Sequence, residues 1–142
     1  MPEASLSSLW SAYQPVLMVL AGMGALSIVQ LLVADVAGIL SRHRPGFPVT
    51  PDAGSFFFRA VRAHANTNES LTAFVILALV AVFAAAPTSF TNGFCVAYGL
   101  GRIGHMLCYY LGWSLARSAS FAVSAVALVG LAGTVLWTLA QA

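Results

Sequence analysis

Four long apolar runs, separated by short polar stretches, make up most of this chain. A helix needs about 20 apolar residues to cross a bilayer, so each run is read as a membrane span. The runs predict helices over about 11–40, 55–86, 94–113 and 118–139. Because the connections are short, we expect an all-α integral membrane protein, an up-down four-helix bundle that forms a single domain over residues 1–142. The start of the chain lacks a basic segment, so the first run is predicted to be a retained helix rather than a signal peptide.

Polar side chains enter the second run only near its start, over residues 56–74. Successive helical residues turn by about 100°, which places four of these side chains in one narrow stripe. The four are Arg59, Arg62, Asn66 and Glu69. His64 and Asn68 lie on roughly the opposite side, and we interpret them as packing residues. The second helix is therefore predicted to carry a binding site in its first half.

The third run repeats this arrangement at spacings of four, three and four residues. The residues that share this face are Tyr98, Arg102, His105 and Tyr109. In two antiparallel helices, residues at equal depth have numbers with a constant sum. Three pairs meet this condition: Arg62 with Tyr109, Asn66 with His105, and Glu69 with Arg102. An unpaired ion at this depth is costly, so we predict that Glu69 and Arg102 form an ion pair, within one chain or between two subunits.

These polar residues admit a structural and a functional explanation. One buried ion pair and a few hydrogen bonds are enough to hold two membrane helices together. The further polar groups exceed that need, which favours a cationic cavity for a small polyanionic ligand. In the first run, Gln30 and Asp35 are the polar interruptions. Because a carboxylate at this depth costs roughly 3 kcal/mol, we expect Asp35 to face protein or water, with an arginine of the next loop as its partner.

Composition narrows the class of protein. Of 142 residues, 60% are hydrophobic and 7% are charged, and the mean hydropathy of +0.89 is outside the usual range of soluble domains. A net charge of +2 without a basic, aromatic-interleaved patch argues against nucleic-acid binding. Cys95 and Cys108 are about 20 Å apart along one predicted helix, so they cannot pair within the chain. The spacing of cysteines and histidines predicts no metal site.

All six cationic residues are arginines, which reflects either a biased base composition or a need to bind carboxylates with two parallel hydrogen bonds. Five of them lie in or beside the first and third connections: Arg42, Arg44, Arg59, Arg62 and Arg117. The positive-inside rule therefore predicts that these connections are cytoplasmic and that both termini are not. Trp10, Tyr13 and Trp137 are expected to anchor helix ends at the membrane interface.

Several segments resemble signatures of a known family. Residues 62–69, Arg-Ala-His-Ala-Asn-Thr-Asn-Glu, followed by Phe74, are similar to the helix-two signature of the MAPEG superfamily, the membrane-associated proteins of eicosanoid and glutathione metabolism. The other matches are Arg102 and His105 with Tyr109 or Tyr110, in the pattern R-x-x-H-x-x-x-Y, and Arg117-Ser118 at the start of helix four. With four spans and short loops, the resemblance covers the whole chain, which looks like a microsomal glutathione transferase.

This resemblance implies a homotrimer in membrane lipid, with glutathione as cosubstrate between neighbouring subunits near the cytoplasmic face. It implies conjugation or peroxide reduction at a lipophilic small molecule that arrives from the bilayer. The residues expected to bind glutathione are Arg59, Arg62, Asn66, Glu69, Arg102, His105 and Tyr109, with Arg42 or Arg44 reaching in from a neighbour. Arg117 is the expected catalytic residue, which stabilises the thiolate, and Ser118 donates a hydrogen bond to sulfur. Asp52 stands where some members carry an aspartate proposed to act in catalysis.

Three positions depart from the family pattern. Residues 70–73 contain no proline after the glutamate, Phe121 replaces a tyrosine, and Ala65 replaces a basic residue that contacts glutathione in some members. These changes leave a second interpretation open, in which the chain is a non-catalytic, lipid- or anion-binding membrane scaffold of the same fold. A transporter is less favoured, because the spans show neither broken helices nor inverted repeats.

Overall fold

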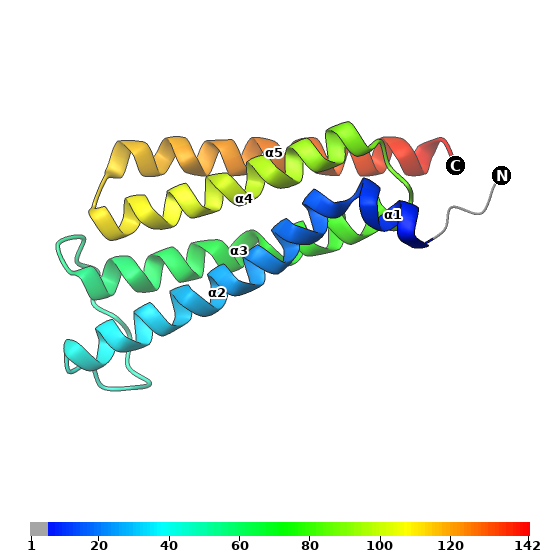
Figure 1. Ribbon diagram of the computed structural model, residues 1–142. Helices are drawn as coiled ribbons and strands as arrows, with labels where there is room; N and C mark the ends of the chain where they lie inside the picture. Colours follow the sequence, from blue (N-terminus) through cyan, green and yellow to red (C-terminus); the bar gives the residue numbers. More distant parts are fainter. Residues whose placement is uncertain (1–5) are drawn as a thin grey trace.

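The computed structural model describes residues 6–142, which form five helices and no strand. They are α1 (Leu6–Ala12), α2 (Gln14–Leu40), α3 (Phe56–Phe83), α4 (Thr88–Leu111) and α5 (Ser114–Ala140). The long helices α2–α5 alternate in direction and form an antiparallel bundle (Figure 1). The α2–α3 loop and the α4–α5 turn lie at one end of the bundle, and α1 and the C-terminal end of α5 lie at the other (Figure 1). The prediction of an all-α bundle is confirmed.

The predicted first helix is divided into two helices at Tyr13. Pro15 occupies the first turn of α2, where a residue without a backbone N–H is tolerated. The side chain of Tyr13 is 2% exposed, and its hydroxyl donates a hydrogen bond to the backbone oxygen of Ala86, after α3. The prediction that Tyr13 anchors the chain at the membrane interface was therefore wrong, because this side chain ties α1–α2 to the end of α3. Trp10 and Trp137 are exposed, as an interface anchor requires.

Helices α4 and α5 both begin earlier than predicted. Pro87 precedes the first turn of α4, so Thr88–Gly93, which read as a turn, is helical. At its other end α4 stops at Gly112, whose φ of 75° is in the left-handed region that favours glycine. Only Gly112 and Trp113 separate α4 from α5, so Arg117 lies in the first turn of α5 rather than in a linker. The predicted start of the fourth helix at residue 118 was therefore wrong, because α5 begins at Ser114.

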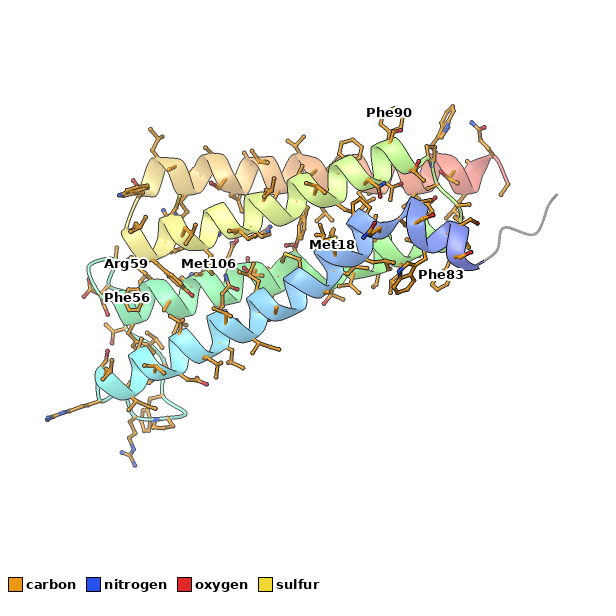
Figure 2. All side chains as sticks on the ribbon, in the orientation of Figure 1. Met18, Phe56, Arg59, Phe83, Phe90 and Met106 are labelled. Carbon is orange, nitrogen blue, oxygen red and sulfur yellow. The ribbon has the colours of Figure 1, made fainter. Side chains whose placement is uncertain are left out.

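Three helices, α2, α3 and α5, are long and apolar enough to cross a membrane by length and composition. Helix α4 is also long, with 24 residues, but it carries Arg102 and His105 and is not among the three. Large apolar side chains cover the outside of the bundle, and Phe83 and Phe90 point away from it (Figure 2). Such a surface is unfavourable in water and favourable in lipid, as expected of a multi-pass membrane protein.

Glycine allows α4 and α5 to pack closely. A Cβ atom added at Gly101 would lie 2.9 Å from the backbone nitrogen of Ser124 and 3.0 Å from the backbone oxygen of Ser120. Small residues at a membrane-helix interface let the backbones approach in this way, which increases van der Waals contact where no hydrophobic effect drives association. This contact holds α5, and therefore Arg117, close to α4.

Replacing Gly101 by alanine is expected to destabilise the bundle by about 1–3 kcal/mol, because the added methyl group meets backbone atoms that cannot rotate away. Gly93, on the same helix, is the matched control, since nothing lies within 4 Å of a Cβ placed there. Gly93→Ala should be neutral or stabilising by up to about 1 kcal/mol through helix propensity alone. The thermal unfolding midpoint in detergent measures both effects. Equal midpoints for the two variants would show that the α4–α5 contact is not tight.

Candidate functional site

Helix α3 faces α4 with residues spaced by four. The hydroxyl groups of Ser70 and Tyr98 are 2.8 Å apart, and the rings of Phe74 and Tyr98 stack with centroids 4.1 Å apart. One turn closer to the α2–α3 loop, Arg102 donates from Nη1 to Oδ1 of Asn66 over 2.7 Å and to its backbone oxygen over 3.2 Å. Ser70 therefore meets Tyr98, and Asn66 meets Arg102. This observed register of α3 against α4 differs from the predicted register by less than one helical turn.

The predicted ion pair between Glu69 and Arg102 was wrong for the chain over residues 6–142, where no such pair forms. Asn66 stands between them, because its Nδ2 donates to Oε2 of Glu69 over 3.3 Å while its Oδ1 accepts from Arg102. Three helical residues turn by about 300°, so Glu69 is rotated by about 60° from Asn66 and from the face that meets α4. Glu69 is consequently exposed, and its carboxylate remains accessible to a ligand.

Arg102 is a buried cation, with 2% of its surface exposed. Its guanidinium carbon lies 5.3 Å from the ring centroid of Tyr98 and 5.4 Å from that of Phe121, on α5. Two aromatic faces and an amide oxygen thus replace the carboxylate that was expected to balance its charge. Its Nε has no hydrogen-bond partner among the described residues. Phe121 was noted only as a departure from the family pattern, and its role as an aromatic partner of Arg102 was missed.

His105, Tyr109 and Arg117 follow Arg102 toward the α4–α5 turn. The ring of His105 is 3% exposed, and it meets the Tyr109 ring edge-on with centroids 5.0 Å apart. The guanidinium carbon of Arg117 lies 4.7 Å from the centroid of the Tyr109 ring. Nδ1 of His105 is buried and has no partner in the described chain. The structure therefore brings together five of the predicted residues along one side of the bundle: Asn66, Arg102, His105, Tyr109 and Arg117.

The remaining predicted residues of α3 and α5 have different surroundings. Arg59 donates from Nη1 to the backbone oxygens of Ala53 and Gly54, each over 2.8 Å, and so holds the α2–α3 loop against the start of α3. Arg62 is exposed, and residues 6–142 offer it no hydrogen bond or ion pair. Ser118 is exposed, and its hydroxyl donates to the backbone oxygen of Ser114 over 3.2 Å. Arg62 is thus the cation of α3 that is free to meet a ligand.

The loop residues form a separate group on the α2 side. Arg42 has a φ of 53°, and the guanidinium carbon of Arg44 lies 4.8 Å from the centroid of the Phe47 ring. Oδ1 of Asp52 accepts a hydrogen bond from the backbone nitrogen of Gly54 over 2.8 Å, which stabilises the turn before α3. A hollow of about 390 Å³ separates these residues from Phe57. Within one chain, Arg42, Arg44 and Asp52 are not brought to the residues around Arg102.

The prediction for His64 and Asn68 concerns the contact between α2 and α3. Nε2 of His64 lies 3.0 Å from Nδ2 of Asn68, whose Oδ1 accepts from the hydroxyl of Ser27 on α2 over 3.3 Å. These contacts tie His64 and Asn68 to the side of α3 that faces α2, although Nδ1 of His64 is buried without a partner among the described residues and Asn68 is exposed. Asp35 is exposed on α2. The described part of the chain gives it no arginine partner, so the expected pairing of Asp35 with an arginine of the next loop was wrong.

Cys95 and Cys108 are buried free thiols, and they form no disulfide with each other, as expected.

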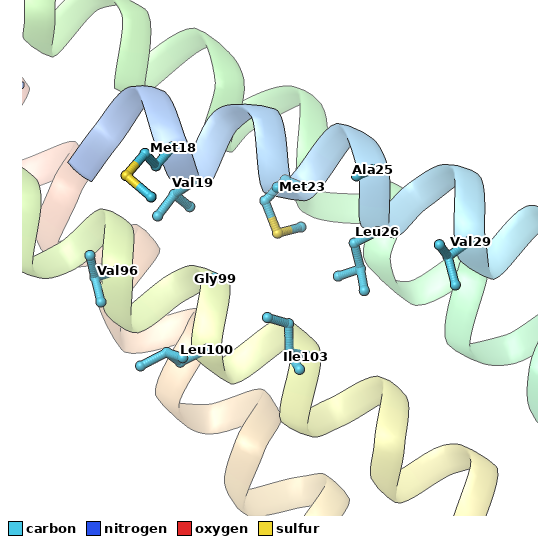
Figure 3. Close-up of a pocket in the computed structure, with 11 residues that line it drawn as sticks. Met18, Val19, Met23, Ala25, Leu26, Val29, Val96, Gly99, Leu100 and Ile103 are labelled. Carbon is cyan, nitrogen blue, oxygen red and sulfur yellow. The ribbon is translucent and has the colours of Figure 1, made fainter. Parts of the chain in front are cut away.

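An apolar groove of about 420 Å³ runs between α2 and α4 (Figure 3). Met18, Met23 and Leu26 approach it from α2, and Leu100 and Ile103 approach it from α4 (Figure 3). Gly22 leaves space unfilled along it, since nothing lies within 4 Å of a Cβ placed there, whereas a Cβ at Gly99 would meet Val19 at 3.0 Å. Its lining carries almost no polar atoms, so the groove suits a hydrocarbon chain rather than a polar ligand.

Comparison with known proteins places these features in context. The family model described as MAPEG family matches residues 7–137, which is nearly the whole chain. None of the curated proteins compared with the chain matches it.

Proposed function

The chain belongs to the MAPEG family, a family of glutathione-related membrane enzymes, and from this premise we propose that it is a glutathione-dependent membrane transferase or peroxidase. The observation that carries the proposal is the row of polar residues from Asn66 to Arg117. This row leaves buried nitrogens of Arg102 and His105 without partners, beside the exposed groups of Arg62 and Glu69. A bundle held together only by polar contacts has no need of such unused groups.

The charges of the row match those of glutathione, which carries two carboxylates, one ammonium group and a thiol. In this proposal the exposed carboxylate of Glu69 accepts hydrogen bonds from the ammonium group. Arg62 binds a carboxylate, as a guanidinium does with two parallel hydrogen bonds. The unpartnered Nδ1 of His105 and the hydroxyl of Tyr109 are polar groups that remain for the peptide backbone. Arg59 is the least available of the predicted ligands, because the loop carbonyls occupy its Nη1.

Arg117 is the proposed catalytic residue. A nearby guanidinium favours the anionic form of a thiol and so lowers the pKa of the glutathione sulfur, and the thiolate is the nucleophile. In conjugation, sulfur forms a bond to an electrophilic carbon, and the displaced group leaves with the bonding electrons. In peroxide reduction, two glutathione molecules supply the two electrons that convert a hydroperoxide into an alcohol and water, and they form a disulfide. Ser118 must release its bond to Ser114 if it is to donate to sulfur.

We further propose that the protein acts as a homotrimer with glutathione between subunits. Arg42 and Arg44 lie apart from the row within one chain, so they reach a ligand only from a neighbouring copy. We also propose that the α2–α3 loop and the α4–α5 turn are cytoplasmic. Five of the six arginines cluster at this end of the bundle, as the positive-inside rule requires.

The thermal unfolding midpoint of the detergent-purified trimer, with and without millimolar glutathione, tests the ligand. A ligand at 100 times its dissociation constant stabilises the native state by about 2.7 kcal/mol, which corresponds to a rise of several degrees. Oxidised glutathione and S-methylglutathione are the controls, since both keep the carboxylates but lack the free thiol. A folded trimer whose midpoint does not change at any glutathione concentration would rule out the proposed cosubstrate.

The apolar groove favours a second candidate function, that of a lipid-binding membrane scaffold without catalysis. A hydrocarbon chain in the groove would contact Met23 and Leu100, and the residues that line the groove include no charged residue. The scaffold predicts that a lipid with a long acyl chain raises the unfolding midpoint whereas glutathione does not. If the protein converted a model electrophile in the presence of glutathione, lipid binding would not be its only function.

A further inference from the structure

The contact between α2 and α3 follows a repeat of seven residues. The buried residues of α2 include Val16, Met23, Gln30 and Ala37, and those of α3 include Ala60, Thr67, Phe74 and Ala81. The two helices run antiparallel (Figure 1), so residues whose numbers have a constant sum lie at equal depth; these are Val16 with Ala81, Met23 with Phe74, Gln30 with Thr67, and Ala37 with Ala60. The spacing of seven residues along this seam is that of one of the two core positions in a coiled-coil heptad.

Other contacts support this register. Val16, Met23, Phe74 and Ala81 belong to one cluster of buried side chains, and Ala37 and Ala60 belong to a second. Between the clusters, the hydrogen bond from Ser27 to Asn68 joins the helices at almost the same register. A Cβ atom added at Gly38 would lie 3.0 Å from the ring of Phe57. The numbers of these two residues add to nearly the same sum as those of the four pairs. The pairing therefore holds from one end of the seam to the other.

Gln30 and Thr67 form the one polar layer among these four pairs. Both residues are 0% exposed, and Nε2 and Oε1 of Gln30 and Oγ1 of Thr67 have no hydrogen-bond partner in the described structure. Buried polar groups without partners disfavour the folded state, so this layer is not explained by stability. A polar pair inside an apolar seam has a known alternative use, which is to select one register over others.

The cost of a wrong register shows how this selection works. If α3 slipped by seven residues, or about 10 Å, the apolar positions of the seam would again face apolar positions. Gln30 would then face Phe74 or Ala60, and Thr67 would face Ala37 or Met23. In the native register the amide of Gln30 and the hydroxyl of Thr67 lie at equal depth on facing helices, so a side-chain rotation can bring them together. In either slipped register each polar group would face hydrocarbon, and no such rotation could supply a partner across the seam.

We propose that Gln30 and Thr67 are positioning residues for the site, because their layer fixes the height of α3 and thereby sets Asn66 level with Arg102. The inference rests on the proposed function, since it concerns how the glutathione site is held. Helix α4 is fixed against the α1–α2 segment by the bond from Asn92 to the backbone oxygen of Ala12. A displacement of α3 along α2 therefore also displaces Asn66 and Glu69, which neighbour Thr67, from the residues of α4.

The double variant Gln30→Leu/Thr67→Val tests this role. It removes the unpartnered polar groups, so its thermal unfolding midpoint should equal or exceed that of the wild type. Its glutathione dissociation constant, from titrated thermal shifts, should rise at least about tenfold. A residue with a merely structural role would instead lower the midpoint and leave the affinity of the folded protein unchanged. Met23→Leu, one layer away, is the matched control and should change neither quantity.

Exchanging the two residues, as Gln30→Thr/Thr67→Gln, keeps a polar layer at the same height. This variant should recover the wild-type affinity for glutathione. If the leucine–valine variant binds glutathione as tightly as the wild type, the positioning role is refuted. It is also refuted if the exchanged variant binds as weakly as the leucine–valine variant.

Oxidative cross-linking measures the register without reference to glutathione. Ser27→Cys/Asn68→Cys places two thiols at facing positions whose present side chains form a hydrogen bond, with Oγ of Ser27 3.3 Å from Oδ1 of Asn68. The disulfide should form readily when the layer is present, and its yield should fall severalfold when Gln30→Leu/Thr67→Val is added. An unchanged yield would refute the register role even if glutathione proved not to be the ligand. A lowered yield would support that role whatever the ligand, so the two proposals fail separately.

Discussion

Replacement of Arg117 by alanine is expected to lower the rate of glutathione conjugation about 100-fold, the usual effect of removing one group that stabilises a developing or reacting anion. Arg117 lies in the first turn of α5, with its guanidinium over the Tyr109 ring, and it makes no ion pair within residues 6–142. Its positive charge is therefore available to a thiolate. Glutathione binding should persist, because its carboxylates and ammonium group have other partners. Initial rates with a chromogenic electrophile, together with titrated thermal shifts, separate the two effects.

The pH dependence of the rate gives a second test of the same residue. Without the guanidinium the pKa of the bound thiol rises, because the neighbouring positive charge no longer favours the anion. The rate of the alanine variant should therefore continue to increase at pH values where the wild-type rate has levelled. Arg117→Lys is the control, since it keeps the charge and should keep most of the activity. Full turnover by Arg117→Ala would show that another residue activates the thiol.

The replacement of Asn66 by alanine is expected to have the largest effect on stability. Oδ1 of Asn66 accepts a 2.7 Å hydrogen bond from Arg102, a cation with 2% of its surface exposed. Removing the partner of a buried charge costs about 3–5 kcal/mol, because the charge remains buried with less compensation. The thermal unfolding midpoint should fall by roughly 10 °C, given about 3 °C per kcal/mol for a chain of this size.

A second substitution separates loss of the partner from loss of packing. In the double variant Asn66→Ala/Arg102→Met the charge itself is absent, and methionine fills a similar volume between Tyr98 and Phe121. Its unfolding midpoint should return most of the way to the wild-type value, while affinity for glutathione stays low. If the double variant were less stable than Asn66→Ala alone, the buried charge would not be the cause of the destabilisation.

The overall architecture was predictable because long apolar runs and short connections leave few alternatives. The helix-two and helix-three patterns led to the family, which the match over residues 7–137 confirms. Helix ends were less predictable, since Thr88–Gly93 contains residues common in turns, yet Pro87 starts a helix there. For the same reason the position of Arg117 in the first turn of α5 was not predicted, because it depended on a turn of only two residues before α5.

The contacts within the site were predictable only to about one helical turn. Equal depth on antiparallel helices correctly paired the region of Asn66 with that of Arg102. It did not show that Asn66 lies on the face toward α4 while Glu69 is rotated outward, because that depends on how α3 is turned about its own axis. Phe121 could have been suggested as a neighbour, since it lies one turn beyond Arg117 on the same helix.

The weak hydropathy of α4 has a consequence for how the chain enters the membrane during synthesis. An arginine near the middle of an apolar helix opposes membrane insertion by about 2.5–3.5 kcal/mol, so we expect α4 to have the least tendency of the four long helices to enter lipid by itself. Its backbone meets α5 at Gly101, and only two residues separate the helices. We therefore expect α4 and α5 to partition into lipid together as a helical hairpin. A nascent chain that ends after Trp113 should leave α4 accessible to water-soluble thiol reagents at Cys108, whereas the complete chain should protect it.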